Sequence, residues 1–214
     1  GQLNTINTLE NNNIKYCGLE NYPTASFEHQ GKKIAFIGFA NSPFTLRMTK
    51  IEKAKELVSN LKESHDIVIV SFHGGAEGQK YKHITKTTEM FLGENRGNPH
   101  LFAHNMIDAG ADLILGHGPH LPRAGEIYKN RLILYSLGNF CTYKQFGLKG
   151  SNAFAPIAFI ELNQSGELIN FDIKSFIQEK PGVLFPDANE SAKNEIFRLS
   201  EIDFPDTGIN KFKK

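Results

Sequence analysis

Three histidines follow directly after two apolar stretches of the sequence. In the string VSFHGGAEG, His73 ends the apolar run and Glu77 stands four residues later. In the string GADLILGHGPH, His117 and His120 occupy the same place after a second apolar run. Neutral imidazole nitrogens coordinate ions such as Zn, Fe and Mn, and glycines let backbone and ligand approach closely. The pattern predicts a metal site with His73, His117 and His120 as ligands, without selecting the metal.

The two apolar runs also predict the strands that would bring these histidines together. The strings DIVIVSF, residues 66–72, and ADLIL are apolar enough for interior strands. In α/β sheets, ligands collect in the crevice outside the carboxyl ends of the strands. Pro119 stiffens the turn that carries His117 and His120. An isolated histidine after a strand is more often a structural residue with a hydrogen-bond partner, so the prediction depends on all three occurring together.

The remaining elements occur in an order typical of α/β proteins. A capping box at Thr49 and Glu52 predicts the start of one helix, and Asn98-Pro99 predicts the start of another, which ends at Gly110. The other predicted elements are a helix at 3–9, strands at 14–18 and 33–39, hairpins at Lys129-Asn130 and Ser165-Gly166, and a last helix capped by Asp187 and Glu190.

The bulk composition limits the classes of function. The chain has 214 residues, enough for one domain with a hydrophobic core, which we expect at residues 1–180 with a helix and tail, 181–214, packed on it. A formal net charge of +1 favours neither nucleic acid nor an anionic membrane as partner. No apolar run reaches the roughly 20 residues that span a bilayer. Two cysteines, Cys17 and Cys141, are too few for a disulfide framework.

Longer strings carry a resemblance to a known family. VSFHGGAEG, DAGADLILGHGPHLPRAGEIYKNRLILYSLGNF and APIAFIEL, in this order, resemble the CapA (PGA_cap) family of bacterial poly-γ-glutamate capsule synthesis proteins. That family is similar to the calcineurin-like metallophosphoesterases, and the resemblance runs from about residue 1 to residue 176. It implies a calcineurin-like α/β sandwich of mixed sheets flanked by helices, with this chain as the later half of the fold.

The resemblance also implies roles for individual residues. The metallophosphoesterases build a two-metal centre from histidines, aspartates and an asparagine on loops. His73 matches the single histidine after a strand, and His117 and His120 match the pair in the Gly-His-x-Pro-His turn. Glu77 matches an acidic residue that follows the first histidine, and Asn139 stands in the string SLGNF. The implied catalytic residues are therefore Glu77, as proton-transfer group, and Asn139.

The sequence departs from the family pattern at its start. The Gly-Asp block, the Asn-x-Glu-like string and the Asn-Asn-His block that precede the first long helix of the family do not occur here. Residues 1–9 resemble the helix that follows the Asn-Asn-His block, so we expect an N-terminally incomplete domain. Three histidines could still hold one ion, but the carboxylate that would bridge two metals has no candidate.

Further polar residues are given structural roles by their surroundings. His100 and His104, four apart on one predicted helix, could mimic a ligand pair, but their apolar neighbours predict packing at a helix–sheet seam. Arg123 and Glu126 follow the histidine turn, and we expect an ion pair or support for the site. The long polar segment 74–97 contains His83, Glu94 and Arg96. We expect this segment to be a solvated loop; the alternative is that it lines a substrate groove in which Arg96 binds an anion.

Two hypotheses of function remain open at this point. The resemblance implies a role in poly-γ-glutamate capsule or related envelope-polymer assembly, at the bacterial envelope or outside it. In one hypothesis the protein is a metal-dependent hydrolase of an envelope-related phosphoester, using a divalent Mn, Zn or Fe ion. In the other it is a non-catalytic component that binds an anionic polymer or other capsule-assembly proteins.

Overall fold

The computed structural model describes residues 1–144 and 147–213. The helices are α1 (Gln2–Asn11), α2 (Ile51–Lys62), α3 (Pro99–Asp108) and α4 (Ser191–Asp203), with short 3₁₀ turns at Gln79–Tyr81, Gly150–Ala153 and Ile209–Phe212. The strands are β1 (Thr24–His29), β2 (Lys32–Phe39), β3 (Ile67–His73), β4 (Met90–Phe91), β5 (Glu94–Asn95), β6 (Leu113–His117), β7 (Gly125–Tyr128), β8 (Arg131–Leu134), β9 (Phe154–Leu162), β10 (Leu168–Glu179) and β11 (Val183–Pro186). Residues 145–146 and 214 lie outside the described residues; they belong to the predicted units 1–180 and 181–214, respectively.

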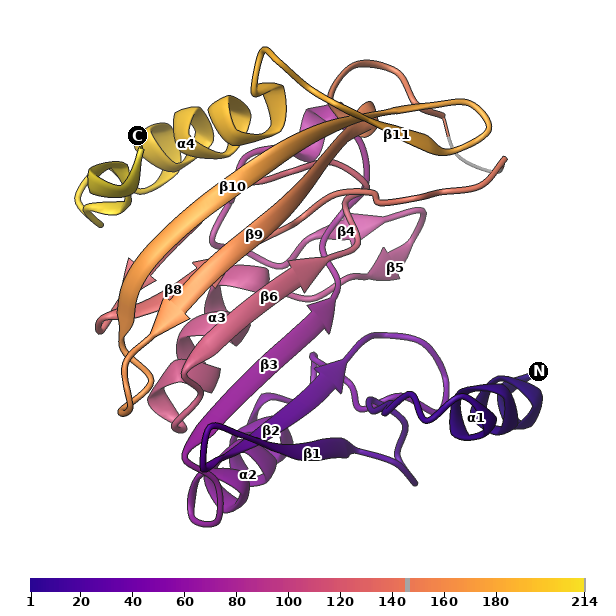
Figure 1. Cartoon of the computed structure of the whole chain (residues 1–214), viewed down its shortest axis with the longest axis vertical. Coiled ribbons are helices and arrows are strands. Elements are labelled where there is room, and N and C mark those ends of the chain that lie inside the picture. Colours follow the sequence, from indigo (N-terminus) through magenta and orange to yellow (C-terminus); the bar gives the residue numbers. More distant parts are fainter. Residues whose placement is uncertain (145–146, 214) are drawn as a thin grey trace.

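The larger sheet has six strands in the order β1-β2-β3-β6-β8-β7. Its four inner strands are parallel, and the edge strands β1 and β7 are antiparallel to their neighbours. The helices α2 and α3 cover one face and lie behind the sheet in Figure 1. Side chains alternate along the strands, so Val70 and Ile114 face these helices whereas Leu113 faces the other way.

A second sheet, in the order β11-β10-β9, covers the opposite face of the larger sheet. Phe171 and Ile173 of β10 pack on Leu132 and Leu134 of β8 in a second core cluster. The helix α4 and the turn at 209–212 contribute apolar side chains to the same cluster: Ile196, Phe197, Ile209 and Phe212. The chain is therefore an α/β sandwich of one mixed and one antiparallel sheet flanked by helices, and the predicted α/β fold class is confirmed.

Most of the predicted elements are present at or near their expected positions. Asn98 caps α3, because its side chain accepts a hydrogen bond from Leu101 N at 2.9 Å, and Pro99 is the first helical residue. The β7–β8 hairpin turns at Lys129 and Asn130, both with positive φ, as a tight hairpin requires. Asp187 accepts a hydrogen bond from Ser191 N at 2.7 Å just before α4, but the N-cap position is Glu190, whose side chain makes no capping hydrogen bond.

Two local predictions are wrong. Residues 14–18 form no strand, because β1 occupies the edge of β2 that they would need, and Ile14 is exposed. The helix α2 begins one residue later than the capping box predicts, with Lys50 at the N-cap position and no side-chain cap. The strands β1, β11 and the β4–β5 pair were not predicted. The sequence of β1, TASFEH, mixes polar and apolar residues without a clean alternation, and the other three strands are too short to show a period.

Candidate metal centre

The two histidine turns lie side by side at the carboxyl ends of β3 and β6. These strands are parallel neighbours, and their register pairs His73 with His117. The contact continues beyond the strands, where Gly74 N donates to His117 O at 2.9 Å and Gly78 N donates to Pro119 O at 3.1 Å. The topology therefore brings together the two turns that the sequence predicted as neighbours.

The glycines in these turns make the close approach possible. Gly118 has a φ of +124°, and a Cβ added there would lie 2.5 Å from the carbonyl oxygen of Gly74. A Cβ added at Gly116 would lie 2.3 Å from the carbonyl oxygen of Tyr135. A larger residue at Gly118 would push the two turns apart, and one at Gly116 would collide with the backbone of Tyr135 after β8.

His120 is held in an unusual backbone conformation next to His73. Its φ is +61°, a region that residues other than glycine, asparagine and aspartate rarely adopt, and its carbonyl oxygen accepts hydrogen bonds from the side-chain amides of Asn139 at 3.1 Å and Asn152 at 2.9 Å. The ring centroids of His73 and His120 are 6.4 Å apart. His120 Nδ1 lies 2.9 Å from Asn139 Oδ1, which can only accept, so Nδ1 donates this hydrogen bond.

The predicted acidic residue lies beside this histidine. Glu77 Oε2 is 3.7 Å from His120 Nε2, and Glu77 Oε1 is 3.1 Å from Arg96 Nη2. Arg96 also forms an ion pair with Glu94 at 3.0 Å. The guanidinium of Arg96, near the end of the long segment 74–97, thus lies beside the site and pairs with the carboxylates of Glu77 and Glu94.

Burial lowers the pKa of two of the imidazoles, which favours their neutral form. Burial lowers the pKa of His117, and the neighbouring His73 lowers it further. For His73, burial is again the largest influence lowering the pKa, followed by the positive charges of His120 and Arg96. The His73 side chain is exposed at its surface, so solvent screens this effect more than at half-buried His117. The neutral form is the one that coordinates metals, so the donor set fits a divalent ion.

A buried ion pair links the first histidine turn to the segment that follows the second one. Arg123 Nη1 is 2.9 Å from Glu89 Oε1, and both side chains are buried. Glu89 Oε2 accepts from Ala76 N at 2.7 Å, and Arg123 donates to the carbonyl oxygen of Ala76 at 3.1 Å. Arg123 and Glu126, expected in an ion pair or in support of the site, therefore have different partners, since Glu126 pairs with His104.

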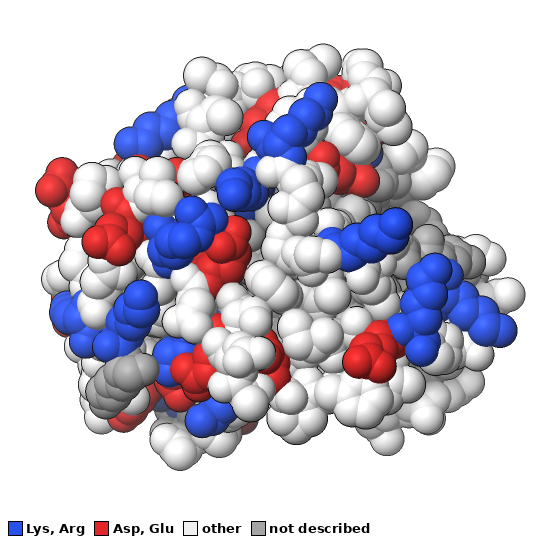
Figure 2. Space-filling model, turned by 90° about the horizontal axis from the view of Figure 1, so that it is seen from above, with Lys and Arg blue, Asp and Glu red and all other residues white. Residues whose placement is uncertain are grey.

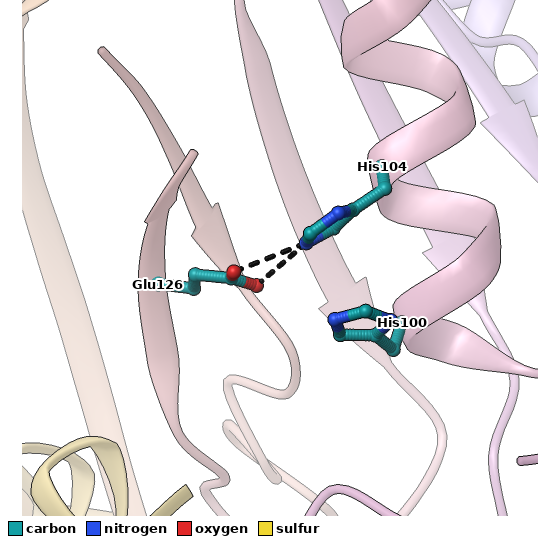
Figure 3. Close-up of side chains that lie close together, drawn as sticks. All are labelled: His100, His104 and Glu126. Atoms are coloured by element: carbon teal, nitrogen blue, oxygen red, sulfur yellow. Dashed lines mark hydrogen bonds and ion pairs between the residues drawn. The ribbon is translucent and has the colours of Figure 1, made fainter. Parts of the chain in front are cut away.

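A second histidine group lies on the helix-covered face of the sheet (Figure 3). Among the described residues, the group of three His, Cys, Asp or Glu whose ligand atoms all lie within 4.8 Å of one another is His100, His104 and Glu126. This group of side chains could hold a metal ion. The histidines at 73, 117 and 120 do not form such a group, although they are neighbours, and their role as ligands stays a prediction.

The surroundings of His100 and His104 are those of a helix–sheet seam. The ring of His104 stacks on Tyr128 with centroids 3.8 Å apart, and the ring of His100 lies parallel to Phe204 at 6.0 Å. The packing expected from the sequence is therefore present. No local pattern indicates that Glu126, which lies on a strand 22 residues after His104, faces these rings.

The charges on the outer surface are mixed. Figure 2 shows the molecule from above, and basic and acidic side chains alternate on this face without a continuous patch of one sign. Among the described residues, no helix is both long and apolar enough to cross a membrane.

The fold and the site together define an α/β sandwich with a histidine cluster at the ends of its parallel strands. The sequence matches the profile of the family described as bacterial capsule synthesis protein PGA_cap over residues 1–144. The chain therefore belongs to this family, and the family predicted from the sequence is confirmed.

Individual relatives cover the chain unevenly. The capsule biosynthesis protein CapA of Bacillus anthracis is 30% identical over 164 residues, which are 65% of this chain and 36% of that protein. The PGA biosynthesis protein CapA of Bacillus subtilis is 38% identical over 84 residues, which are 39% of this chain and 19% of that protein. The chain thus spans about a third or less of the length of these relatives.

Solved structures add little to this assignment. A candidate 5′-nucleotidase from Staphylococcus aureus superposes with a TM-score of 0.46 and 14% identity, covering 91% of this chain and 38% of that chain. A hypothetical protein from Thermus thermophilus has the same TM-score and 15% identity, covering 73% of this chain and 62% of that chain. A similarity at this level carries no argument about activity.

Proposed function

We propose that this chain serves in the synthesis of a bacterial capsule or related envelope polymer, and that His73, His117 and His120 bind a divalent ion of the Mn, Zn or Fe class there. The relatives named for capsule and PGA biosynthesis support the first part. The pairing of His73 with His117 across β3 and β6, with His120 beside them, is the observation that supports the second.

The remaining residues have separable tasks in this proposal. Asn139 and Asn152 are positioning residues, because they fix the backbone of His120, and Asn139 also fixes the orientation of its ring. Glu77 is the proton-transfer residue, since its carboxylate lies 3.7 Å from His120 Nε2. A bound divalent ion would supply Lewis acidity and lower the pKa of a coordinated water.

The activity that this donor set would support is hydrolysis of a phosphoester in an envelope-related substrate. The alternative is binding of an anionic polymer without turnover. The separation of the three histidines, whose ligand atoms do not all lie within 4.8 Å of one another, favours the alternative for this chain by itself. Both would place the protein at the bacterial envelope or outside the cell, together with other capsule-assembly proteins.

Metal analysis and turnover separate the two activities. The purified chain is loaded with Mn²⁺ or Zn²⁺, its bound metal is counted, and hydrolysis of p-nitrophenyl phosphate is followed. A hydrolase loses its turnover in the His117→Asn variant and keeps it in the His29→Asn variant, which changes an exposed histidine on β1. If no turnover is detected, or if turnover does not depend on His117, the result counts against the hydrolase hypothesis.

Binding of the polymer is tested independently. Affinity for poly-γ-glutamate is measured at several salt concentrations, with the same two variants. A polymer-binding protein shows an affinity that falls with salt and is weakened by His117→Asn. Indifference to the polymer at low salt would overturn the binding alternative.

A further inference from the structure

His100, His104 and Glu126 are arranged as a two-histidine, one-carboxylate ligand set. The two histidines are four residues apart on α3, so the helix places both rings on one face, with centroids 4.0 Å apart. Glu126 reaches them from β7 across the seam (Figure 3). We propose that these three side chains form a second divalent-metal site, of the Zn²⁺ class, that fastens α3 to the edge strand β7.

The carboxylate already lies at coordinating geometry relative to one histidine. His104 Nε2 is 3.0 Å from both carboxylate oxygens of Glu126, so a single N–H is shared between two acceptors. Two ligand atoms on one tetrahedral Zn²⁺ are about 3.3 Å apart, because each metal–ligand bond is about 2.0–2.1 Å. An ion can therefore replace the shared proton, which is released to solvent, with little movement of either side chain.

The third ligand has no competing partner. The ring nitrogens of His100 make no hydrogen bond to any residue in 1–144 or 147–213, although its ring lies between polar and aromatic neighbours. Its ligand atom lies within 4.8 Å of those of His104 and Glu126. A shift of about 1.5 Å would close the set, and coordination would supply the partner that His100 lacks.

The surroundings preorganise the carboxylate. The hydroxyl of Tyr135 donates to Glu126 Oε2 at 2.6 Å, and this second partner fixes the orientation of the carboxylate as supporting residues do in metal sites. Burial of Glu126 would raise its pKa, but the hydrogen bonds from His104 and Tyr135 outweigh burial and lower it. The side chains of His104 and Glu126 are 20% and 7% exposed, so solvent reaches the site and an ion can enter.

The choice of metal follows from the donors. Two imidazoles and one carboxylate suit Zn²⁺ and its analogue Co²⁺ better than Mg²⁺ or Ca²⁺, which prefer oxygen ligands. The set leaves a fourth position for water.

The test counts Zn²⁺ in the full chain while the strand-end histidines are removed. In a variant with His73→Asn, His117→Asn and His120→Asn, calorimetric titration with Zn²⁺ alone is expected to show one ion per chain. Adding His100→Phe, which keeps the ring beside Phe204 and removes both nitrogens, is expected to weaken this binding at least tenfold. His29→Asn, an exposed histidine, leaves it unchanged.

Co²⁺ absorption and a comparison of two single-chain stoichiometries provide independent tests of the same site. Co²⁺ bound to the same variant is expected to give the visible absorption of a tetrahedral site, and His100→Phe abolishes it. If the triple variant does not fold, the stoichiometries of the otherwise unsubstituted chain and of His100→Phe alone are compared, and they are expected to differ by one ion. Equal affinity and stoichiometry with and without His100 would overturn the proposal, whatever the strand-end histidines do.

Discussion

The two histidine groups are built on different supports. His73, His117 and His120 stand on turns at the ends of parallel strands, where backbone contacts and asparagine amides hold them. His100 and His104 stand on one helix and meet Glu126 across a packed seam of aromatic rings. The turn-borne group is more exposed and spread apart, whereas the helix-borne group is compact and partly enclosed. Position in the fold, more than residue type, therefore separates a candidate reaction site from a candidate structural metal site.

The largest effect on stability is expected at the buried ion pair of Arg123 and Glu89, beside the strand-end histidines. Arg123→Met leaves the buried carboxylate of Glu89 without its partner, so we expect the free energy of unfolding to fall by about 3–5 kcal/mol. Urea denaturation measures it. Arg198→Met, which removes an ion pair with Glu195 on the outer surface of α4, is the matched control and should cost less than about 1 kcal/mol. Equal losses in the two variants would show that the buried pair does not support the turns.

The next effect concerns the second group. Tyr135→Phe keeps the ring but removes the hydroxyl that donates to Glu126, so we expect a loss of about 1.5–3 kcal/mol in the free energy of unfolding. Tyr128→Phe is the control, because its hydroxyl reaches the exposed carboxylate of Asp108 at 3.2 Å, and it should cost less than about 0.5 kcal/mol. A loss below 1 kcal/mol in Tyr135→Phe would contradict the structural importance of the buried carboxylate.

The strand-end group should also make the stability of the protein depend on pH when a chelator keeps the protein free of metal. Burial lowers the pKa of His117 in the folded state below its ordinary value of 6.5, so the unfolded state binds this proton more readily. The stability contributed by neutral His117 is full above pH 6.5 and is lost as the pH falls through the folded-state pKa. We expect a slope of at most about 1.4 kcal/mol per pH unit from this residue.

Denaturation between pH 7.5 and 5 measures that slope. The variant His117→Asn should flatten it, and the control His29→Asn should leave it unchanged. An unaltered slope in His117→Asn would mean that the buried ring does not titrate as the geometry requires.

The smallest effect on stability is expected at Glu77. Its ion pairs with Arg96 and His120 are partly exposed, so Glu77→Gln should change the free energy of unfolding by less than about 1 kcal/mol. If Glu77 transfers protons, the same substitution should lower metal-dependent turnover by about 10²–10⁴-fold. Stability and turnover falling together would instead indicate that Glu77 maintains the turn. Glu94→Gln, which removes the other partner of Arg96, is the control for both measurements.

Strong periodic signals in the sequence predicted the parts of the fold that local physics controls. The apolar strings DIVIVSF and ADLIL form β3 and β6, and Asn98 with Pro99 begins α3, because burial and capping act over a few residues. The edge strand β1 was missed, since its residues are mostly exposed and its position depends on pairing with β2. Pairing partners far apart in sequence leave little local trace.

For the sites, the sequence by itself determined which side chains are available, and that His73, His117 and His120 follow strands. Only the tertiary structure decided that β3 and β6 are parallel neighbours, which places two of these histidines in register. It also decided that Glu126 faces His104, because the antiparallel edge strand β7 brings position 126 next to a helix that ends at Asp108. The physical reason is that the hydrophobic pattern fixes each element and its buried face, whereas the packing of distant elements fixes which polar groups meet.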